Sequence, residues 1–245
     1  MAFAGSTGAL LAEPVADVAA RITTPSSAEP AAPGAEPAAP GATMEAGGRY
    51  AEAAVAALNA DPLAVHIEQV VTATSTRGGW TVETLATMSG NVSGKNLSVE
   101  VWAISAGQHV NAKVRVVGRA AYAMVKGAWV KRKRSQVKEQ IEALHEAIRL
   151  VDDPLDLRYV GVERVGKRDL IHLTAATSIP YEPILHGPTG RFDAFDLWVT
   201  KDGTPVRFEG RFSAGGGADR YTGTTTIGFS KYGVKIKIKA PKIGR

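Results

Sequence analysis

The sequence predicts a mainly β fold of the α+β class, in which an antiparallel sheet of about ten or eleven strands packs against a long amphipathic helix. Three observations predict it. Residues 195–212 alternate apolar and polar side chains on both sides of Asp202-Gly203, a pair typical of β-hairpin turns. The β-rich runs of residues 80–132 are joined by connections too short for parallel crossovers. At residues 135–151 the hydrophobic period changes to that of a helix.

The hairpin at residues 195–212 also predicts its own register. A two-residue turn at Asp202-Gly203 separates apolar from polar side chains, whereas a turn one residue longer would mix them on each face. In the shorter register Val199 faces Val206, Leu197 faces Phe208, Phe195 lies near Phe212, and Trp198, Asp196 and Ala194 lie opposite Arg207, Glu209 and Arg211. We therefore expect one dry and one wet face.

Further strands are expected before and after this hairpin. A short Ala-rich helix at residues 50–59 ends at Asp61-Pro62 and leads directly into the first strand. The expected strands are residues 63–74, 80–88, 97–105, 109–117, 119–125, 129–132, 155–164, 169–176 and 221–230. Residues 178–190 combine three prolines with several apolar residues, which predicts a loop that folds over another part of the molecule.

The major helix is expected at residues 135–151. Val137, Ile141, Leu144 and Ile148 recur at steps of three and four, so they share one side of the helix. Ser135 is the expected N-cap, and Asp-Asp-Pro at residues 152–154 ends the helix. The apolar side is expected to lie on the sheet.

The N-terminal part has a different character. Residues 28–41 repeat Ala-Glu-Pro-Ala-Ala-Pro-Gly twice, which predicts a semi-rigid linker with no core of its own. Residues 9–22 have helical spacing on an Ala-rich background and predict no more than a marginal helix. We expect a disordered extension at residues 1–47 and a folded domain at residues 48–245. The extension is either a tether or a segment without a function.

Composition limits the classes of function. The chain has 245 residues, 44% of them hydrophobic, and no cysteine, which excludes disulfides, thiolate zinc sites and cysteine nucleophiles. Residues 61–245 hold 27 basic and 18 acidic residues, a net charge of +9. Such a surface could attract a membrane, an acidic lipid headgroup or nucleic acid, or be a basic surface without a partner. No run approaches 18 apolar residues, and residues 1–20 lack a signal peptide pattern.

No catalytic or metal-binding site is predicted. Ser135 and Lys138 have the S-x-x-K spacing of penicillin-interacting enzymes, but the partner motifs are missing. His145-Glu146 begins like a zinc protease motif, and Arg149 occupies the place of the second ligand. The basic run Lys131–Arg134 has one aromatic neighbour, Trp129, too few for a nucleic-acid platform. A solvated run or binding to anionic lipid headgroups fits better, and we expect no cofactor.

The ordered set of motifs resembles the LolA-like superfamily, and most nearly the LppX/LprG-type lipoproteins of the bacterial envelope. The motifs are the Ala-rich helix leading into a strand, Arg115–Gly118 before Tyr122 and Gly127–Lys131, the amphipathic helix ending at Asp-Pro, Val165–Lys167 before Ile171–Leu173, Leu197–Val206, and Phe229–Gly233. They span roughly residues 48–242. The sequence lacks the signal peptide and lipidated cysteine usual in such proteins, and its Pro-rich loop replaces a helical segment.

The resemblance implies a half-barrel, a curved antiparallel sheet whose concave face is covered by helices around a cavity for acyl chains. The residues implied to line the cavity are Val65, Ile67, Val99, Val101, Val114, Val116, Val137, Ile141, Leu144, Ile148, Leu197 and Phe208, with Ile179, Tyr181, Ile184 and Leu185 at its mouth. The implied function is non-catalytic binding or carriage of a lipid or of lipoprotein acyl chains by an extracytoplasmic monomer.

A second reading keeps the fold and gives it another role. A helix packed on a sheet buries the same residues without any ligand, so the core could be filled. The protein would then be a structural or sensory module that contacts a protein partner through the wet face around Trp198, Arg207 and Arg211.

Overall fold

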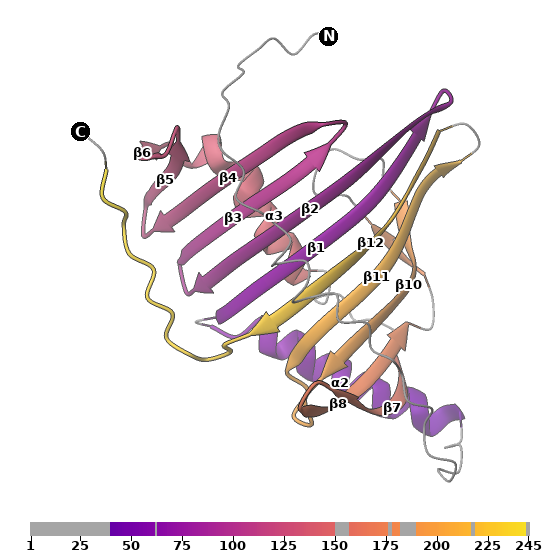
Figure 1. Cartoon of the computed structure of the whole chain (residues 1–245). Coiled ribbons are helices and arrows are strands. Elements are labelled where there is room, and N and C mark those ends of the chain that lie inside the picture. The colour runs from indigo at the N-terminus through magenta and orange to yellow at the C-terminus, as the bar shows by residue number, and fades with distance from the viewer. Residues whose placement is uncertain are drawn as a thin grey trace. The chain divides into compact units, whose positions relative to one another are not determined.

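The computed structural model describes residues 40–243, apart from 62, 150–156, 176–177, 182–189 and 217–218. Residues 38–245 form one compact unit, dominated by a single antiparallel sheet (Figure 1). Its strand order is β6-β5-β4-β3-β2-β1-β12-β11-β10-β8-β7, and β9 pairs with β10 beside β8. The strands are β1 (Ala64–Arg77), β2 (Trp80–Ser93), β3 (Asn96–Ser105), β4 (Gln108–Val117), β5 (Ala120–Val125), β6 (Ala128–Arg132), β7 (Leu157–Val165), β8 (Arg168–Ala175), β9 (Ile179–Tyr181), β10 (Gly190–Val199), β11 (Pro205–Gly216) and β12 (Asp219–Ser230).

This architecture confirms the predicted fold class. Each strand expected from the sequence is present, with most bounds shifted by a few residues. The largest differences are at β2 and β10, which are longer than expected, and at β9, which lies in the segment predicted as a loop. β8 pairs with β10 only at residues 196–199, so β9 can pair with residues 190–192 on the same edge.

The register predicted for the β10–β11 hairpin is correct over most of its length. Leu197 pairs with Phe208, and the outward pairs of Trp198 with Arg207 and Asp196 with Glu209 are also as predicted. The turn is longer than predicted, because the ladder shifts by one residue and ends with Val199 opposite Pro205. Thr200 and Thr204 exchange hydrogen bonds across the turn, and Gly203 adopts a φ of +86°.

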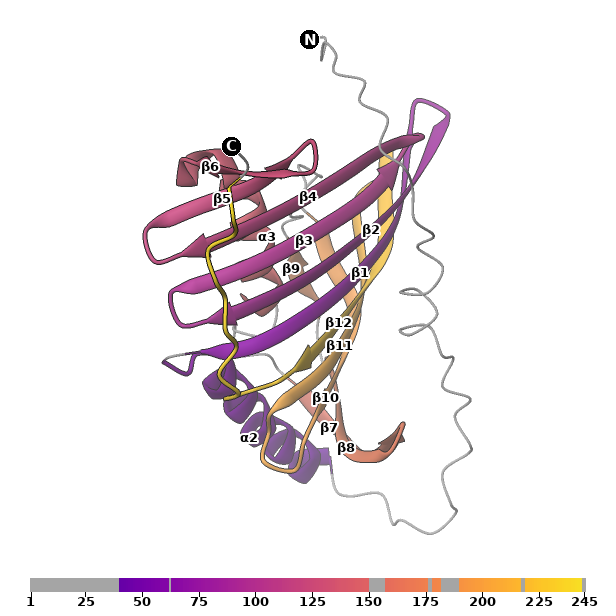
Figure 2. The same ribbon diagram turned by 60° about the vertical axis from the view of Figure 1, so that its left-hand side comes forward.

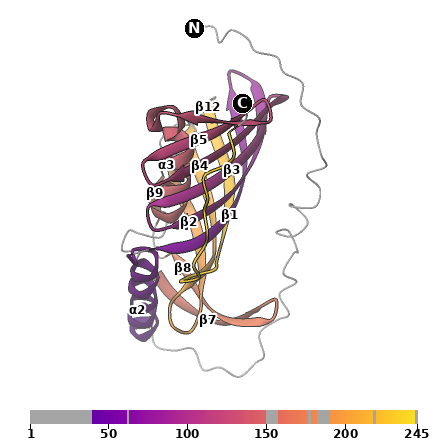
Figure 3. The same cartoon turned by 90° about the vertical axis from the view of Figure 1, so that its left-hand side faces the viewer.

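The sheet bends around one of its faces, which we call the inner face (Figures 2 and 3). A 3₁₀ turn η1 (Arg134–Val137) runs into helix α3 (Lys138–Arg149), which contacts β1, β3 and β4 on this face. Leu144 lies directly over Gly90 of β2, where a side chain would collide with it. Ser135 is not the N-cap as predicted: the helical segment starts one residue earlier, with Lys133 at the cap, and Gln136 accepts a hydrogen bond from the Lys133 backbone.

Helix α2 (Pro40–Leu58) begins ten residues before the predicted helix. It packs against β7 and against the β10–β11 turn, where Ala53 approaches Gly203. Glycines 47 and 48 interrupt the Ala-rich pattern of the sequence, yet Gly47 is buried where α2 touches Leu157 of β7. This contact favours the helical conformation of a segment whose composition alone does not predict it.

Candidate ligand-binding face

The inner face carries all the residues that the sequence assigned to a cavity wall. Ten of the twelve are buried, and Val101 and Ile141 are half-buried against the same core. Val65, Ile67, Val99, Val101, Val114, Val116, Leu197 and Phe208 come from the sheet, and Val137, Ile141, Leu144 and Ile148 from η1 and α3. The structure therefore brings the predicted set together in one apolar layer. Whether this layer binds a ligand stays a prediction.

One half of the inner face is filled by aromatic rings. Phe192 and Phe195 of β10 and Phe208 and Phe212 of β11 are all at most 2% exposed. Phe195 stacks on Phe208 with ring centroids 5.5 Å apart, and Phe192 meets Phe208 edge-on at 5.7 Å. Their rings fit because Gly210 has no side chain at the point where those of Phe192 and Phe208 approach. This half of the face is a packed core.

The other half is lined by smaller side chains and is less completely covered. One row of cross-strand partners on the inner face runs through Val71, Ala86, Ala103 and Val110 on β1 to β4. Val71 is half-buried and Val110 is 55% exposed. Val101 and Ile141, in the neighbouring row and on α3, are also only half-buried. An apolar strip with a floor of alanines thus continues beyond α3 toward solvent, and we call it the alanine strip.

Two polar side chains are buried among these apolar residues. Gln69 of β1 and Thr225 of β12 are 4% and 2% exposed, and the Gln69 amide donates a 3.1 Å hydrogen bond to the Thr225 hydroxyl. Both belong to the inner face, between the aromatic half and the alanine strip. Sequence periodicity could not select them, because both interrupt the apolar pattern.

The structure describes only two of the four residues predicted at the mouth of the cavity. Ile179 and Tyr181 belong to β9, which pairs with β10. Ile184 and Leu185 lie outside the described residues. The described part of the chain also has a shallow hollow of about 930 Å³ on the outer face, lined largely by threonines such as Thr72, Thr74 and Thr224. Its lining mixes threonines with apolar residues such as Leu85 and Ile104 and includes none of the residues predicted to line the cavity.

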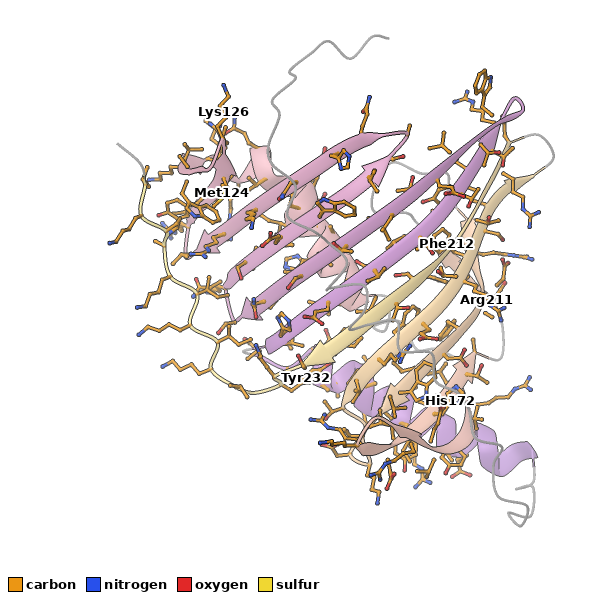
Figure 4. The ribbon with its side chains drawn as sticks, viewed as in Figure 1. Met124, Lys126, His172, Arg211, Phe212 and Tyr232 are labelled. Carbon is orange, nitrogen blue, oxygen red and sulfur yellow. The ribbon has the colours of Figure 1, made fainter. Side chains whose placement is uncertain are left out.

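The outer face holds a polar cluster around His172, which Figure 4 labels, and sequence reasoning did not assemble it. His172 of β8 stacks on Trp198 of β10 with centroids 4.7 Å apart, and its Nε2 lies 2.9 Å from Asp196. Trp198 donates a 2.8 Å hydrogen bond to Glu163 of β7, whose carboxylate is 3.4 Å from His172 Nδ1. The guanidinium carbon of Arg207 also lies over the Trp198 ring, 5.5 Å from the ring centroid. The sequence predicted that Trp198 pairs with Arg207 on the wet face. It did not predict that β7 and β8 lie beside this pair.

Asp196 gives this cluster a pH-dependent contribution to stability. The hydrogen bond from His172, opposed by partial burial and supported by one from Thr174, lowers the pKa of the Asp196 carboxyl. A carboxyl with a lowered folded-state pKa stabilises the fold above its unfolded value, about 3.9, and loses this effect as the pH falls.

We therefore expect Asp196→Asn to cost about 1 kcal/mol of unfolding free energy at pH 6 and clearly less at pH 3. Urea unfolding at both pH values measures this, with Asp219→Asn at an exposed position as the control. An equal cost of Asp196→Asn at both pH values would contradict the assignment.

The motifs considered for catalysis are not assembled into a site. Ser135 and Lys138 are both exposed, and Lys138 forms an ion pair at 3.2 Å with Glu142 on its own helix. Within the described residues, no group of three His, Asp or Glu side chains is placed to hold a metal ion. No helix among them is long and apolar enough to cross a membrane.

Comparison with known proteins finds similarity in structure. No family model matches the chain, and no curated protein matches its sequence. LprF from Mycobacterium bovis is 13% identical with a TM-score of 0.48, covering 80% of this chain and 97% of that one. The lipoprotein LppX from Mycobacterium tuberculosis is 12% identical with a TM-score of 0.40, covering 82% and 100%. A LolA superfamily protein from Nitrosomonas europaea is 11% identical with a TM-score of 0.25, covering 81% and 95%.

LppX and the LolA superfamily are also the proteins that the sequence resembles. At these identities and TM-scores, none of the likenesses assigns a ligand to this chain.

Proposed function

We propose that the chain binds a hydrophobic ligand, a lipid or the acyl chains of a lipoprotein, without catalysis. The observation that carries the proposal is the alanine strip, where Val71, Val101 and Ile141 are half-buried and Val110 is 55% exposed around a floor of two alanines that are 8–9% exposed. Burying apolar surface contributes roughly 25 cal/mol per Å², so the partly exposed apolar side chains around this floor favour an apolar occupant.

The position of α3 supports the same function. The helix rests on the sheet through Leu144 at Gly90, and the next rows of β1 to β4 lie beyond this contact. Ala86 and Ala103 provide a low floor there, while Val71 and Val110 lie at the two ends of the row. An acyl chain is apolar, as are the side chains of this strip. The resemblance to envelope lipoproteins supports action at the bacterial cell envelope.

Blocking the alanine strip tests the proposal. We expect Ala103→Trp to weaken binding of a dansylated fatty acid by at least about tenfold, because the indole would occupy the floor of the strip. Ile104→Trp is the matched control: it is the next residue of β3, half-buried, and faces the outer side of the sheet, where it lines the outer hollow, so it separates binding at the two faces. We expect that variant to bind within about twofold of wild type.

The binding titration needs two companion measurements. Thermal unfolding shows whether Ala103→Trp folds, since overpacking costs typically about 1–3 kcal/mol. Mass spectrometry of mildly purified protein shows whether a lipid copurifies. Wild-type protein that carries no lipid and does not bind the fatty acid would refute the proposal.

The aromatic half of the inner face favours a second candidate function, a structural or sensory module with a filled core. Phe192, Phe195, Phe208 and Phe212 pack on one another and leave that half of the face closed. The outer cluster, in which His172 and Arg207 are half-buried and Trp198, expected on the wet face, is only 8% exposed, would then be part of the surface for a protein partner. Equal fatty-acid binding by Ala103→Trp and wild type would favour this candidate.

A further inference from the structure

The last residues of the chain form an extended segment, Lys231–Ile243, which we call the strap. It leaves the end of β12 and begins beside β1, where the Gly233 amide donates a hydrogen bond to the Ala64 carbonyl. Tyr232 packs against the core at this point. From there the strap crosses the ends of β1 to β4 (Figures 1 to 3).

Half-buried apolar and exposed basic side chains alternate along the middle of the strap. Ile236 and Ile238 are half-buried, whereas Lys235, Lys237 and Lys239 are exposed. In an extended chain alternate side chains point to opposite sides, so the three lysines form a row directed away from the sheet. Figure 4 shows long side chains ending in nitrogen along this segment.

The strand register brings further cations to the same end of the sheet. Lys95 lies in the β2–β3 turn and Arg119 in the β4–β5 turn, and these turns share one end because Leu97 pairs with Val116. Arg132 pairs with Ala121 and so reaches this end too. Together the exposed cations are Lys95, Arg119, Lys131, Arg132, Lys133, Arg134, Lys235, Lys237, Lys239 and Lys242, a set that we call the basic edge.

The basic edge has little internal compensation. Among the residues that the structure describes, none of its ten cations forms an ion pair with an acidic side chain. The acidic residues that follow its segments most closely in the sequence are Glu100, which comes after Lys95 and pairs with Lys113, and Glu139, which comes after Arg134. Clusters of four to eight basic residues are sufficient to attract anionic lipid surfaces.

We propose that the basic edge docks on a bilayer that contains anionic phospholipid. Lysines can place their charges among phosphate groups while their methylene stems stay over apolar surface. Val234 and Ile243, at the two ends of the row, are 56% and 51% exposed and can enter the headgroup region. Single-stranded nucleic acid is disfavoured, because its binding uses rings presented for base stacking, and the ring of Trp129 is covered by Arg115, 4.8 Å from its centroid.

Flotation with lipid vesicles tests this surface independently of ligand binding by the alanine strip. The full chain is expected to bind vesicles of phosphatidylcholine with 30% phosphatidylglycerol, and to bind pure phosphatidylcholine at least about tenfold more weakly. Raising the salt from 0.05 to 0.5 M is expected to release it, because the contact is electrostatic.

Two variants with the same net charge show whether binding depends on the basic edge or only on the total charge of the protein. The first variant is expected to bind the anionic vesicles at least about tenfold more weakly than wild type. In it, Gln replaces Lys235, Lys237, Lys239 and Lys242. Replacing Arg77, Lys167, Arg168 and Lys201 by Gln removes four exposed cations elsewhere and is expected to change binding by less than about threefold. Thermal unfolding confirms that both variants fold.

Three outcomes would overturn the proposal. They are no binding of wild-type protein to anionic vesicles, equal losses in the two quadruple variants, and tighter binding to a 30-base DNA than to the vesicles at the same salt concentration. The last result would assign the edge to nucleic acid.

Discussion

Gly47→Ala is expected to lower the free energy of unfolding by about 1–3 kcal/mol, although alanine is the better helix former. Gly47 lies in α2 where the helix meets β7, and a Cβ there would overlap the backbone carbonyl of Leu157. A backbone group cannot move aside as the end of a flexible side chain can. The helix must therefore shift away from β7, or the strand must bend.

The neighbouring glycine is a matched control for this prediction. A Cβ on Gly48 has no heavy atom within 4 Å, so Gly48→Ala is expected to raise the free energy of unfolding by about 0.5–1 kcal/mol. Urea unfolding of the two variants should therefore give changes of opposite sign. Stabilisation by both substitutions would show that α2 does not pack on β7 as described.

Phe208→Ala is expected to be the most destabilising single substitution tested, at about 3–5 kcal/mol. Phe208 is fully buried and contacts the rings of both Phe192 and Phe195. Chemical unfolding measures the loss, and Val162→Ala, at a position 59% exposed on β7, should stay within about 0.5 kcal/mol of wild type.

A double-mutant cycle distinguishes ring packing from simple burial. Phe195 and Phe208 stack with an interplanar angle of 24°, and such pairs contribute about 0.5–1.5 kcal/mol beyond burial. We expect the cost of Phe208→Ala to fall by about this amount in a Phe195→Ala background. Independent, additive costs would mean that the rings do not form one packed unit.

The hairpin shows how far local pattern determines structure. The alternation on both sides of Asp202-Gly203 predicted the pairing of Leu197 with Phe208 and of Asp196 with Glu209, because a one-residue slip would move every apolar side chain to the wet face. The turn itself was wrong by one residue on one strand. Hydrogen bonds between Thr200 and Thr204, which no hydrophobic pattern encodes, set that geometry.

The helices show the opposite dependence. The apolar side of α3 was predicted from spacing, but its resting place on Gly90 depends on the distant strand β2. The first ten residues of α2 were missed, because a Pro-, Gly- and Ala-rich segment has no helical pattern of its own and is held by contact with β7. The residues predicted to line a cavity share one apolar layer, while the buried pair Gln69 and Thr225 interrupts the periodicity and was not found.

The sequence by itself determined the class of the fold, the strand order along the chain and the sides of the strands that turn inward, because these follow from local periodicity and short connections. Only the tertiary structure decided which residues from distant strands meet. It closed the aromatic half of the inner face, left the alanine strip partly open and gathered the cations of three turns and the strap at one edge. Those properties depend on the bending of the sheet and on contacts between segments far apart in the chain, which no local pattern contains.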